Sequence, residues 1–363
     1  MKKFFTILAL ATLAIGLTGS CDKEEKSPEK ETGRSQSCEK ESDDGWFPSL
    51  PDNTKLIDMT IPGLHDAATW AFDGSHPFAP GFKDQAIPYC DAYSLGARAF
   101  DLRIGFDDNL CFSDNFGDFC RFFHGVMDIM ATFNLSQMNK IGSDIALFPS
   151  PLQLKNDFMI LFVQWEYPRN SELQKSVFHY LMKQLVARYG EGSFIAYNPN
   201  LTKKDLTGRI LVIAQNEEFL RHYEAGSMPP VPMSYYNKNE HTIQAFIGNT
   251  LVGEKYPVYE VNNWELESGT WQEKWDGDIK TYFSADRPGN RMQILYANAI
   301  IPNLSNMFGG WEVCPHINAD LALYLKNNPQ SSGIVMMDFF GKNEMDGHNF
   351  HGKDLGDALI NCN

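Results

Sequence analysis

Short apolar stretches recur along the chain from Trp46 to Cys362, and helix-like spacers separate several of them. Many of the stretches are continuously apolar, which is typical of strands that are covered on both faces. About eight strands with helical spacers favour an α/β fold, a single distorted (β/α)8 barrel of the TIM type over residues 45–363. The expected strands are 56–61, 97–104, 120–124, 157–163, 209–214, 256–261, 292–297 and 333–339.

Two spacers carry apolar residues at helical spacing. Residues 172–189 are expected to form an amphipathic helix that ends at Gly190, and residues 319–326 another that stops before Pro329. The pattern over 220–290 is weak, and 256–261 is the one strand expected there.

The N-terminus has the pattern of a targeting segment. Lys2 and Lys3 precede an apolar run, residues 4–17, that is too short to span a bilayer. Small residues then precede Cys21, which resembles a bacterial lipoprotein cleavage site. We therefore expect residues 1–20 to be a signal peptide and Cys21 to be lipidated. The protein would then be an exported lipoprotein of the outer membrane, on its periplasmic or cell-surface face. A plain secretory signal is the alternative.

Composition narrows the range of partners. Residues 21–44 are charged and nearly free of apolar side chains, so we expect a flexible, lipid-anchored tether. The formal net charge of −15 argues against nucleic acid as a partner. It also argues against electrostatic recruitment to anionic membranes.

Seven cysteines are present, and export would permit disulfides. Cys111 and Cys120 bracket a short insert rich in Asp, so this pair is the first disulfide to expect. No cysteine and histidine spacing suggests zinc.

Two histidines and one arginine are the strongest candidates for chemistry. His65 follows a Pro-Gly turn, Arg103 lies in Phe-Asp-Leu-Arg, and His124 lies in Phe-Phe-His-Gly. Two imidazoles and a guanidinium can cleave a phosphodiester without metal, because one histidine accepts a proton, the other donates one, and the cation holds the phosphate. Taken singly, His65 could be a loop residue and His124 a core histidine.

Three carboxylates can support this group. Asp101 and Arg103 share one face of a strand, so in a barrel interior they must pair or serve a ligand. Asp338 ends the last apolar strand. Because the last barrel strand closes against the first, Asp338 should lie beside His65 and fix its tautomer. Asp66 could serve His124 in the same way.

These segments together resemble the bacterial phosphatidylinositol-specific phospholipase C family, over most of residues 55–345. The resemblance rests on these motifs: Ile-Pro-Gly-Leu-His-Asp at 61–66, Arg-Ala-Phe-Asp-Leu-Arg at 98–103, Phe-His-Gly at 123–125, Met-Ile-Leu-Phe-Val-Gln-Trp-Glu at 159–166, Trp-Gln-Glu-Lys-Trp at 271–275, Ile-Asn-Ala-Asp-Leu-Ala-Leu-Tyr-Leu-Lys at 317–326, and Asp338.

The resemblance implies a barrel with an open C-terminal face and a defined mechanism. His65, oriented by Asp338, would deprotonate the inositol 2-hydroxyl, which attacks phosphorus. His124, supported by Asp66, would protonate the diacylglycerol oxygen. Arg103 would stabilise the phosphorane. The products would be diacylglycerol and a cyclic inositol phosphate.

The resemblance also bears on cofactors and partners. Calcium-dependent relatives carry acids where the metal-free type has an arginine, so Arg103, with Asp101 behind it, implies no metal and no other cofactor. The implied partner is a phospholipid, and the implied state is a monomer.

Several positions depart from the family pattern. Gln164 stands where a lysine usually reaches the head group, and Gln215 stands where an arginine is often found. Glu273 and Trp275 match the acid and the stacking aromatic expected near inositol. The resemblance therefore implies intact phosphate chemistry with altered head-group recognition, for an inositol lipid, a glycosylated lipid or another vicinal-hydroxyl head group.

The spacing from Arg103 to His124 is longer than usual. The extra residues, 111–120, would form a loop at the barrel rim, and their three phenylalanines could insert into lipid. Alternatively, they cover the barrel wall.

Three other functions compete with a lipid phosphodiesterase. A barrel without activity could bind head groups or glycans. A glycosidase could use Asp338 and Glu166, but this leaves the histidines and Arg103 unexplained. Glycerophosphodiester hydrolases usually add metal-binding glutamates near the first histidine, and the sequence has none there.

Overall fold

The computed structural model describes residues 45–72, 83–107, 115–124, 140–167, 171–220, 229–248, 250–264, 266, 270–285, 290–300 and 310–363. The predicted signal peptide (1–20), the predicted tether (21–44) and Cys21, whose lipidation is expected, lie outside the described residues. Within the described part of the chain, no helix is both long and apolar enough to cross a membrane.

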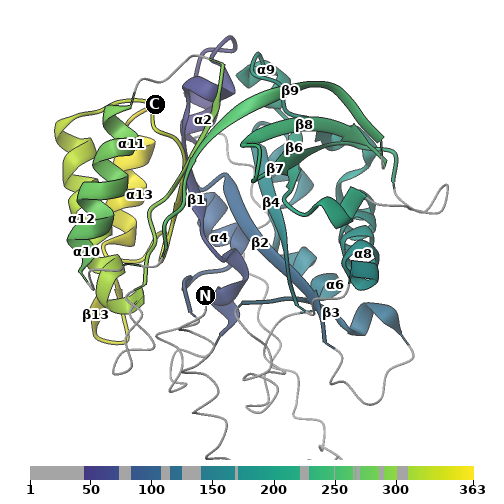
Figure 1. Cartoon of the computed structure of the whole chain (residues 1–363), viewed down its shortest axis with the longest axis horizontal. Coiled ribbons are helices and arrows are strands. Elements are labelled where there is room, and N and C mark those ends of the chain that lie inside the picture. Colours follow the sequence, from purple (N-terminus) through teal and green to yellow (C-terminus); the bar gives the residue numbers. More distant parts are fainter. Residues whose placement is uncertain are drawn as a thin grey trace, which may run out of the picture.

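Nine strands close into one barrel around which the helices pack (Figure 1). The ring closes because β1 pairs with both β11 and β2, always in parallel. Around the ring the strands are β1 (Thr60–Leu64), β11 (Gly333–Met337), β10 (Met292–Tyr296), β9 (Thr250–Val261), β8 (Thr242–Ile247), β7 (Pro232–Asn237), β6 (Arg209–Ala214), β4 (Phe158–Tyr167) and β2 (Ala99–Phe106).

The predicted α/β barrel of the TIM type is confirmed, but one strand of the ring runs the other way. β8 is antiparallel to both β7 and β9, and every other pairing in the ring is parallel. The hairpin falls in the region where the sequence pattern was weak. The ring consequently holds nine strands rather than the eight expected.

Four short strands lie outside the ring. β3 (Cys120–Phe122) adds antiparallel to the end of β2, and β5 (Phe194–Ile195) adds to β6. β12 (Glu344–Met345) and β13 (His348–Asn349) form a separate hairpin. The predicted strand 120–124 therefore exists, but it extends the sheet beyond β2 and does not belong to the closed ring.

The helices follow the predictions where the sequence was periodic. The predicted helix 172–189 is α8 (Ser171–Tyr189), which ends before Gly190 at a φ of +81°. The predicted helix 319–326 is the second half of α12 (Gly310–Asn327). The other helices are α2 (Trp46–Ser49), α4 (Tyr89–Ser94), α6 (Ile141–Asp144), α7 (Pro151–Leu154), α9 (Lys203–Leu206), α10 (Trp271–Glu273), α11 (Lys280–Ser284) and α13 (Gly352–Ile360).

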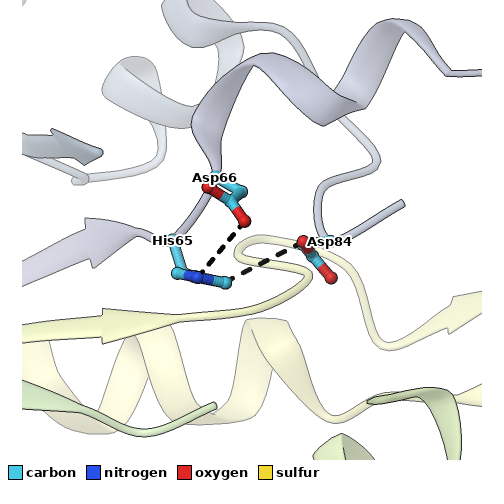
Figure 2. Close-up of side chains that lie close together, drawn as sticks. All are labelled: His65, Asp66 and Asp84. Carbon is cyan, nitrogen blue, oxygen red and sulfur yellow. Dashed lines mark ion pairs between the residues drawn. The ribbon is translucent and has the colours of Figure 1, made fainter. Parts of the chain in front are cut away.

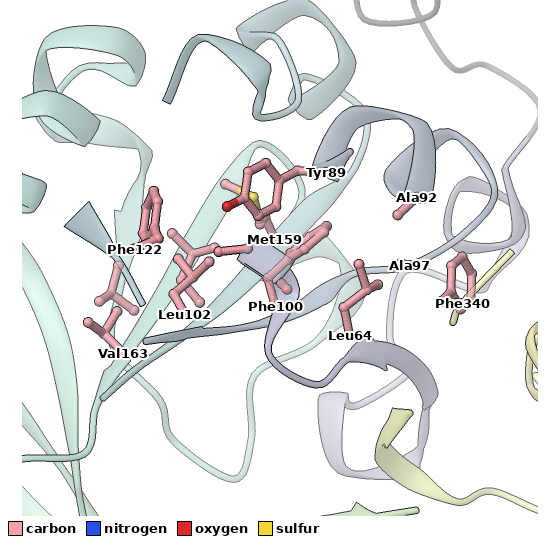
Figure 3. Close-up of a cluster of buried hydrophobic side chains, with 14 of the residues drawn as sticks. Leu64, Tyr89, Ala92, Ala97, Phe100, Leu102, Phe122, Met159, Val163 and Phe340 are labelled. Carbon is pink, nitrogen blue, oxygen red and sulfur yellow. The ribbon is translucent and has the colours of Figure 1, made fainter. Parts of the chain in front are cut away.

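Two apolar layers hold the molecule together. Side chains that point inward from the strands fill the barrel, and Ile160, Phe162 and Met336 belong to this layer. Outward-pointing side chains meet the surrounding helices, as Figure 3 shows for Leu64, Phe100 and Leu102. Since successive residues of a strand point to opposite faces, each barrel strand contributes to both layers. This explains the continuously apolar pattern of the sequence.

A buried ion pair joins the residue before β2 to the residue before β4. Arg98 donates from Nε to Asp157 Oδ1 at 2.7 Å, and its Nη2 lies 2.5 Å from Asp157 Oδ2. Its Nη1 donates to the carbonyls of Tyr93 and Ala97, and its guanidinium lies 3.9 Å from the centroid of the Tyr93 ring. Every polar group of this fully buried pair is thus satisfied.

Candidate active site

The barrel interior changes from apolar to polar along each strand. On β2 the inward positions run from Ala99 to Asp101 and Arg103, and on β4 they run from Phe162 to Gln164. On β11, Met336 is followed inward by Asp338. Because these strands are parallel, their polar positions meet at one end of the barrel, and a polar site forms over an apolar floor.

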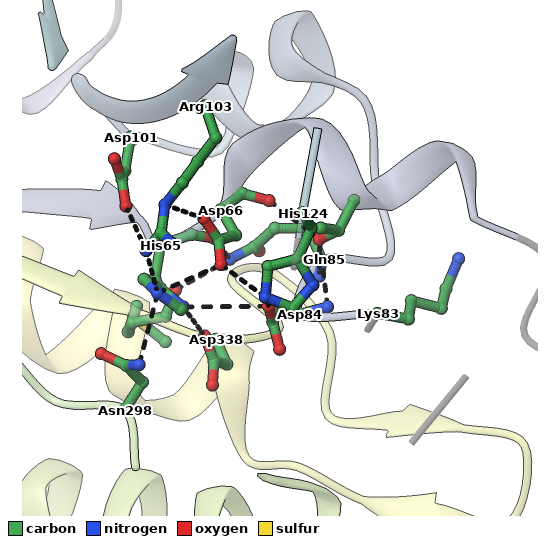
Figure 4. Close-up of polar contacts among 12 residues, drawn as sticks. His65, Asp66, Lys83, Asp84, Gln85, Asp101, Arg103, His124, Asn298 and Asp338 are labelled. Carbon is green, nitrogen blue, oxygen red and sulfur yellow. Dashed lines mark hydrogen bonds and ion pairs between the residues drawn. The ribbon is translucent and has the colours of Figure 1, made fainter. Parts of the chain in front are cut away.

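His65 and Asp338 meet where the barrel closes. Leu64 pairs with Met337 in the β1–β11 register, so the next residues on the two strands lie side by side. Asp338 Oδ1 is 2.9 Å from His65 Nδ1, and both side chains are buried. The predicted placement of Asp338 beside His65 is therefore observed (Figure 4). Gly63 permits this close approach, since a Cβ there would lie 2.5 Å from Met336 Sδ.

Asp66 lies at the centre of the site. Its backbone takes a left-handed conformation, with φ of 42°, directly after His65. Its carboxylate lies 2.5 Å from Arg103 Nε, 2.9 Å from His124 Nε2 and 3.3 Å from His65 Nε2. Burial alone would raise the pKa of Asp66, but Arg103 and the two histidines hold it well below its usual range. One buried carboxylate therefore joins both histidines to the arginine.

Arg103 is held by carboxylates on three sides. Besides Asp66, its guanidinium lies 3.5 Å from Asp101 and 3.5 Å from Glu166. Nη2 lies 3.1 Å from His65 Nε2. A guanidinium donates but never accepts, so in the neutral form of the ring this contact uses the Nε2 lone pair and leaves the proton on Nδ1, facing Asp338. The predicted pairing of Asp101 with Arg103 is present.

The surrounding acids favour protonation of both histidines. Burial opposes the charged imidazole of His65, but Asp66 and Asp338 outweigh it and raise the pKa to about 10. For His124, burial is likewise outweighed by Asp66 and Asp84, and the pKa rises to about 9. Two imidazoles that can each hold a proton beside one cation are suited to proton transfer around a phosphate.

Asp84 belongs to the site, and the sequence interpretation missed it. Its Oδ2 lies 3.5 Å from His124 Nε2 and 3.9 Å from His65 Nδ1. Burial and the neighbouring Asp338 raise the pKa of Asp84 to about 7. The signal available in the sequence was its place in the connection after the first strand, because such loops line the active face of these barrels.

Gln85 fixes this loop to the barrel seam. Its side-chain amide donates to the carbonyls of His65 and Met337, each at 2.8 Å. The amide nitrogen of Phe339 donates to Asp84 O at 2.7 Å. These bonds hold the Asp84 carboxylate near both His65 and His124.

His65, Asp66 and Asp84 also form a group that could hold a metal ion, since their ligand atoms lie within 4.8 Å of one another (Figure 2). The Arg103 guanidinium already neutralises Asp66 and contacts His65. A divalent cation there would face the repulsion of this fixed positive charge.

The four predicted head-group residues separate into two pairs. Gln164 faces the barrel interior beside Arg103, and Gln215 is buried at the end of β6. Trp275 instead packs on the outer side, against Tyr324 of α12, and Glu273 ends helix α10 in the same outer layer. The prediction that Glu273 and Trp275 line the site with Gln164 is therefore wrong, because their helix covers the barrel instead of following a strand end.

Of the predicted rim loop 111–120, the structure describes residues 115–120. Cys111 and Phe112 lie outside the described residues. Phe116 is 38% exposed and packs on Phe106, and Phe119 stacks on the same ring. These two rings thus cover the end of β2.

The expected Cys111–Cys120 disulfide is not formed. Cys120 is a free, buried thiol in β3 that lies 3.4 Å from the carbonyl oxygen of Phe116. Burial raises the pKa of this thiol to about 12, so it is protonated and unreactive at neutral pH. Cys90 is the cysteine that is disulfide-bonded among the described residues.

No protein-family model and no curated protein sequence matches the chain. Solved structures do match it. The phosphatidylinositol-specific phospholipase C of Listeria monocytogenes has a TM-score of 0.55 at 17% identity, over 88% of this chain and 98% of that one. The Staphylococcus aureus enzyme has a TM-score of 0.55 at 15% identity, over 88% and 97%.

The chain has the fold of bacterial phosphatidylinositol-specific phospholipases C. The resemblance that the motifs indicated is thus confirmed at the level of the fold. At this identity the comparison does not assign roles to His65, His124 or Arg103, which depend on the geometry above.

Proposed function

We propose that the protein is a metal-independent phosphodiesterase that cleaves the phosphodiester of an inositol lipid. The observation that carries the proposal is the junction at Asp66, where two histidines and Arg103 meet within 3.3 Å of one buried carboxylate. In this proposal the neutral form of His65 is the reactive one: Asp338 holds its Nδ1 proton, and Nε2 accepts the proton of the substrate.

The proposed reaction is an internal transfer. His65 Nε2 takes the proton of the head-group hydroxyl next to the phosphate, and that oxygen attacks phosphorus. Arg103, backed by Asp101, stabilises the charge that develops on the phosphoryl oxygens. His124 gives a proton to the departing diacylglycerol oxygen. The products are a cyclic inositol phosphate and diacylglycerol, and no water is consumed in this step.

Competing functions fit the geometry less well. A glycosidase needs two available carboxylates. Asp338 is bonded to His65 and Glu166 lies 3.5 Å from Arg103, so both are engaged with cationic or basic groups of the site. A head-group or glycan-binding barrel would not need two histidines held ready for proton transfer.

The proposed setting is a membrane surface. A lipid on Cys21 would anchor the exported protein in the bacterial outer membrane. The tether over 21–44 would then keep a monomeric barrel near its phospholipid substrate. Phe116, exposed at the rim, would add contact with lipid.

The deciding experiment incubates the purified protein with phosphatidylinositol vesicles in excess EDTA. We expect diacylglycerol together with the phosphorus NMR signal of cyclic inositol phosphate, and neither product with the His65→Ala variant. Activity that appears only with added calcium would replace the metal-independent mechanism by one that uses His65, Asp66 and Asp84 as ligands. No products under either condition would reject an inositol-lipid substrate.

A further inference from the structure

A second cation lies beside Arg103 on the barrel wall. Gln164 pairs with Arg103 in the β2–β4 register, so their side chains lie next to each other on the inner face. Lys238 Nζ donates to Gln164 Oε1 at 2.7 Å. This lysine does not come from β4 itself. It comes from the end of β7, two strands further around the ring.

The local fold directs Lys238 inward. Tyr236 belongs to the inner layer of the barrel, and Lys238 is the next position on the same face. Asn237 Oδ1 then accepts from the backbone N–H groups of Asn239 and Glu240 at 3.1 and 3.3 Å, which turns the chain back into β8. The turn thus leaves Lys238 as the last inward residue of its strand.

The Lys238 ammonium has more donors than protein acceptors. An ammonium has three N–H donors, and within the described residues Gln164 is its one hydrogen-bond acceptor. No described carboxylate lies within ion-pairing distance, although Glu260, Asp101 and Glu166 are near enough to favour its charge. Burial outweighs them and lowers the pKa of Lys238. A half-buried cation with donors that the protein does not use is suited to a ligand that completes its bonds.

Gln215 on β6 provides an independent observation. β6 lies between β4 and β7, so Gln215 stands between the strands that supply Gln164 and Lys238. The residue is 8% exposed, and its amide lies beside the Tyr296 hydroxyl, with no other side-chain hydrogen-bond partner among the described residues. A primary amide has two donors and an oxygen that can accept twice, so this one retains hydrogen-bonding capacity for a ligand.

We propose that Lys238, Gln164 and Gln215 bind the hydroxyl groups of the head-group ring while Arg103 holds the adjacent phosphate. This inference rests on the proposed phosphodiesterase function and specifies its substrate. The acids around Lys238, which are Glu166, Glu260 and Asp101, disfavour a second phosphate on the ring. The preferred head group is therefore an uncharged polyol, and its recognition depends on a cation supplied from β7.

The first test measures binding of free myo-inositol to the full chain by calorimetry. We expect binding by the native protein and by His65→Ala, and affinity lower by about 10- to 100-fold in Lys238→Met, because a charged hydrogen bond is lost. Lys255→Met is the matched control, since Lys255 is an exposed lysine that pairs with Glu240 at 2.6 Å. Equal binding by Lys238→Met, or no binding by the native protein, would overturn the inference.

The second test compares turnover of vesicles. With phosphatidylinositol, Lys238→Met should raise KM much more than it lowers kcat, and phosphatidylinositol 4-phosphate should be a poorer substrate than phosphatidylinositol for the native protein. A preference for the phosphorylated lipid would overturn the uncharged head group. If the native protein binds inositol but cleaves neither lipid, the proposed function fails and the binding role of Lys238 stands.

Discussion

Asp338 Oδ1 lies 2.9 Å from His65 Nδ1, although 273 residues separate the two in the chain. Closure of the barrel produces this contact, because β11 pairs with β1 and the register of this pair places the two residues side by side. The contact determines which ring nitrogen of His65 holds the proton, and thus which nitrogen can act as a base.

Replacing Asp338 by Asn should lower the pKa of His65. Asp66 and Asp338 together raise that pKa to about 10 against the effect of burial, so loss of one charge leaves burial less opposed. The pKa of His124 should move less, since its nearest acids are Asp66 and Asp84. NMR titration of the imidazoles measures both values. An unchanged His65 titration would refute the assigned electrostatic role of Asp338.

Alanine at His65 or His124 should each reduce cleavage by about 10²- to 10⁴-fold, the usual contribution of a general acid or base. The double variant should lose little more than either single variant, because the two histidines act in one transfer. His351→Ala is the control, as this histidine pairs with Asp354 at the surface. Substantial activity in either single variant, with an unchanged circular dichroism spectrum, would contradict the assigned roles.

Lysine in place of Arg103 should lower kcat by about 10²- to 10³-fold. The guanidinium spans Asp66, Asp101 and Glu166 at once, and an ammonium cannot reproduce that planar set of donors. Chemical denaturation would show whether the variant folds. Full activity in a folded Arg103→Lys protein would exclude Arg103 as the phosphate ligand.

The sequence was sufficient to predict the site residues that lie at the ends of barrel strands. It was insufficient to predict those that a loop or a hairpin brings into the site. Asp338, Asp101 and Arg103 followed from side-chain alternation and barrel closure, which depend on local pattern. Asp84 lies in a connection without periodicity, and its approach to both histidines depends on Gln85 bonding the barrel seam.

The same limit explains the head-group residues. Lys238 could not be found because β7 and β8 form an antiparallel hairpin whose sequence pattern is weak. Glu273 and Trp275 were assigned to the site by motif alone, and motif does not reveal which face of the barrel a helix covers. The free thiol of Cys120 likewise depends on tertiary position, since proximity in sequence says little about sulfur geometry.

Asn at Asp84 should lower the pKa of His124. Asp66 and Asp84 raise that pKa to about 9, so removing the charge of Asp84 should move the edge of the rate profile that follows the pKa of His124 to lower pH. Activity at neutral pH should persist. The measurement is kcat against pH, with and without EDTA. If Asp84→Asn abolishes activity and the native protein is sensitive to EDTA, Asp84 is a metal ligand.

Methionine at Arg98 should lower the free energy of unfolding by about 3–5 kcal/mol, because it leaves Asp157 buried and unpaired. The double variant Arg98→Met with Asp157→Leu should recover much of that loss, since no charge then remains in the pocket. Urea denaturation measures both. Arg98 and Asp157 join the beginnings of β2 and β4, whose other ends carry Arg103 and Gln164. If the double variant regains stability but not turnover, the pair also sets the register that places the phosphate and head-group residues side by side. If both return, the pair is needed only for folding.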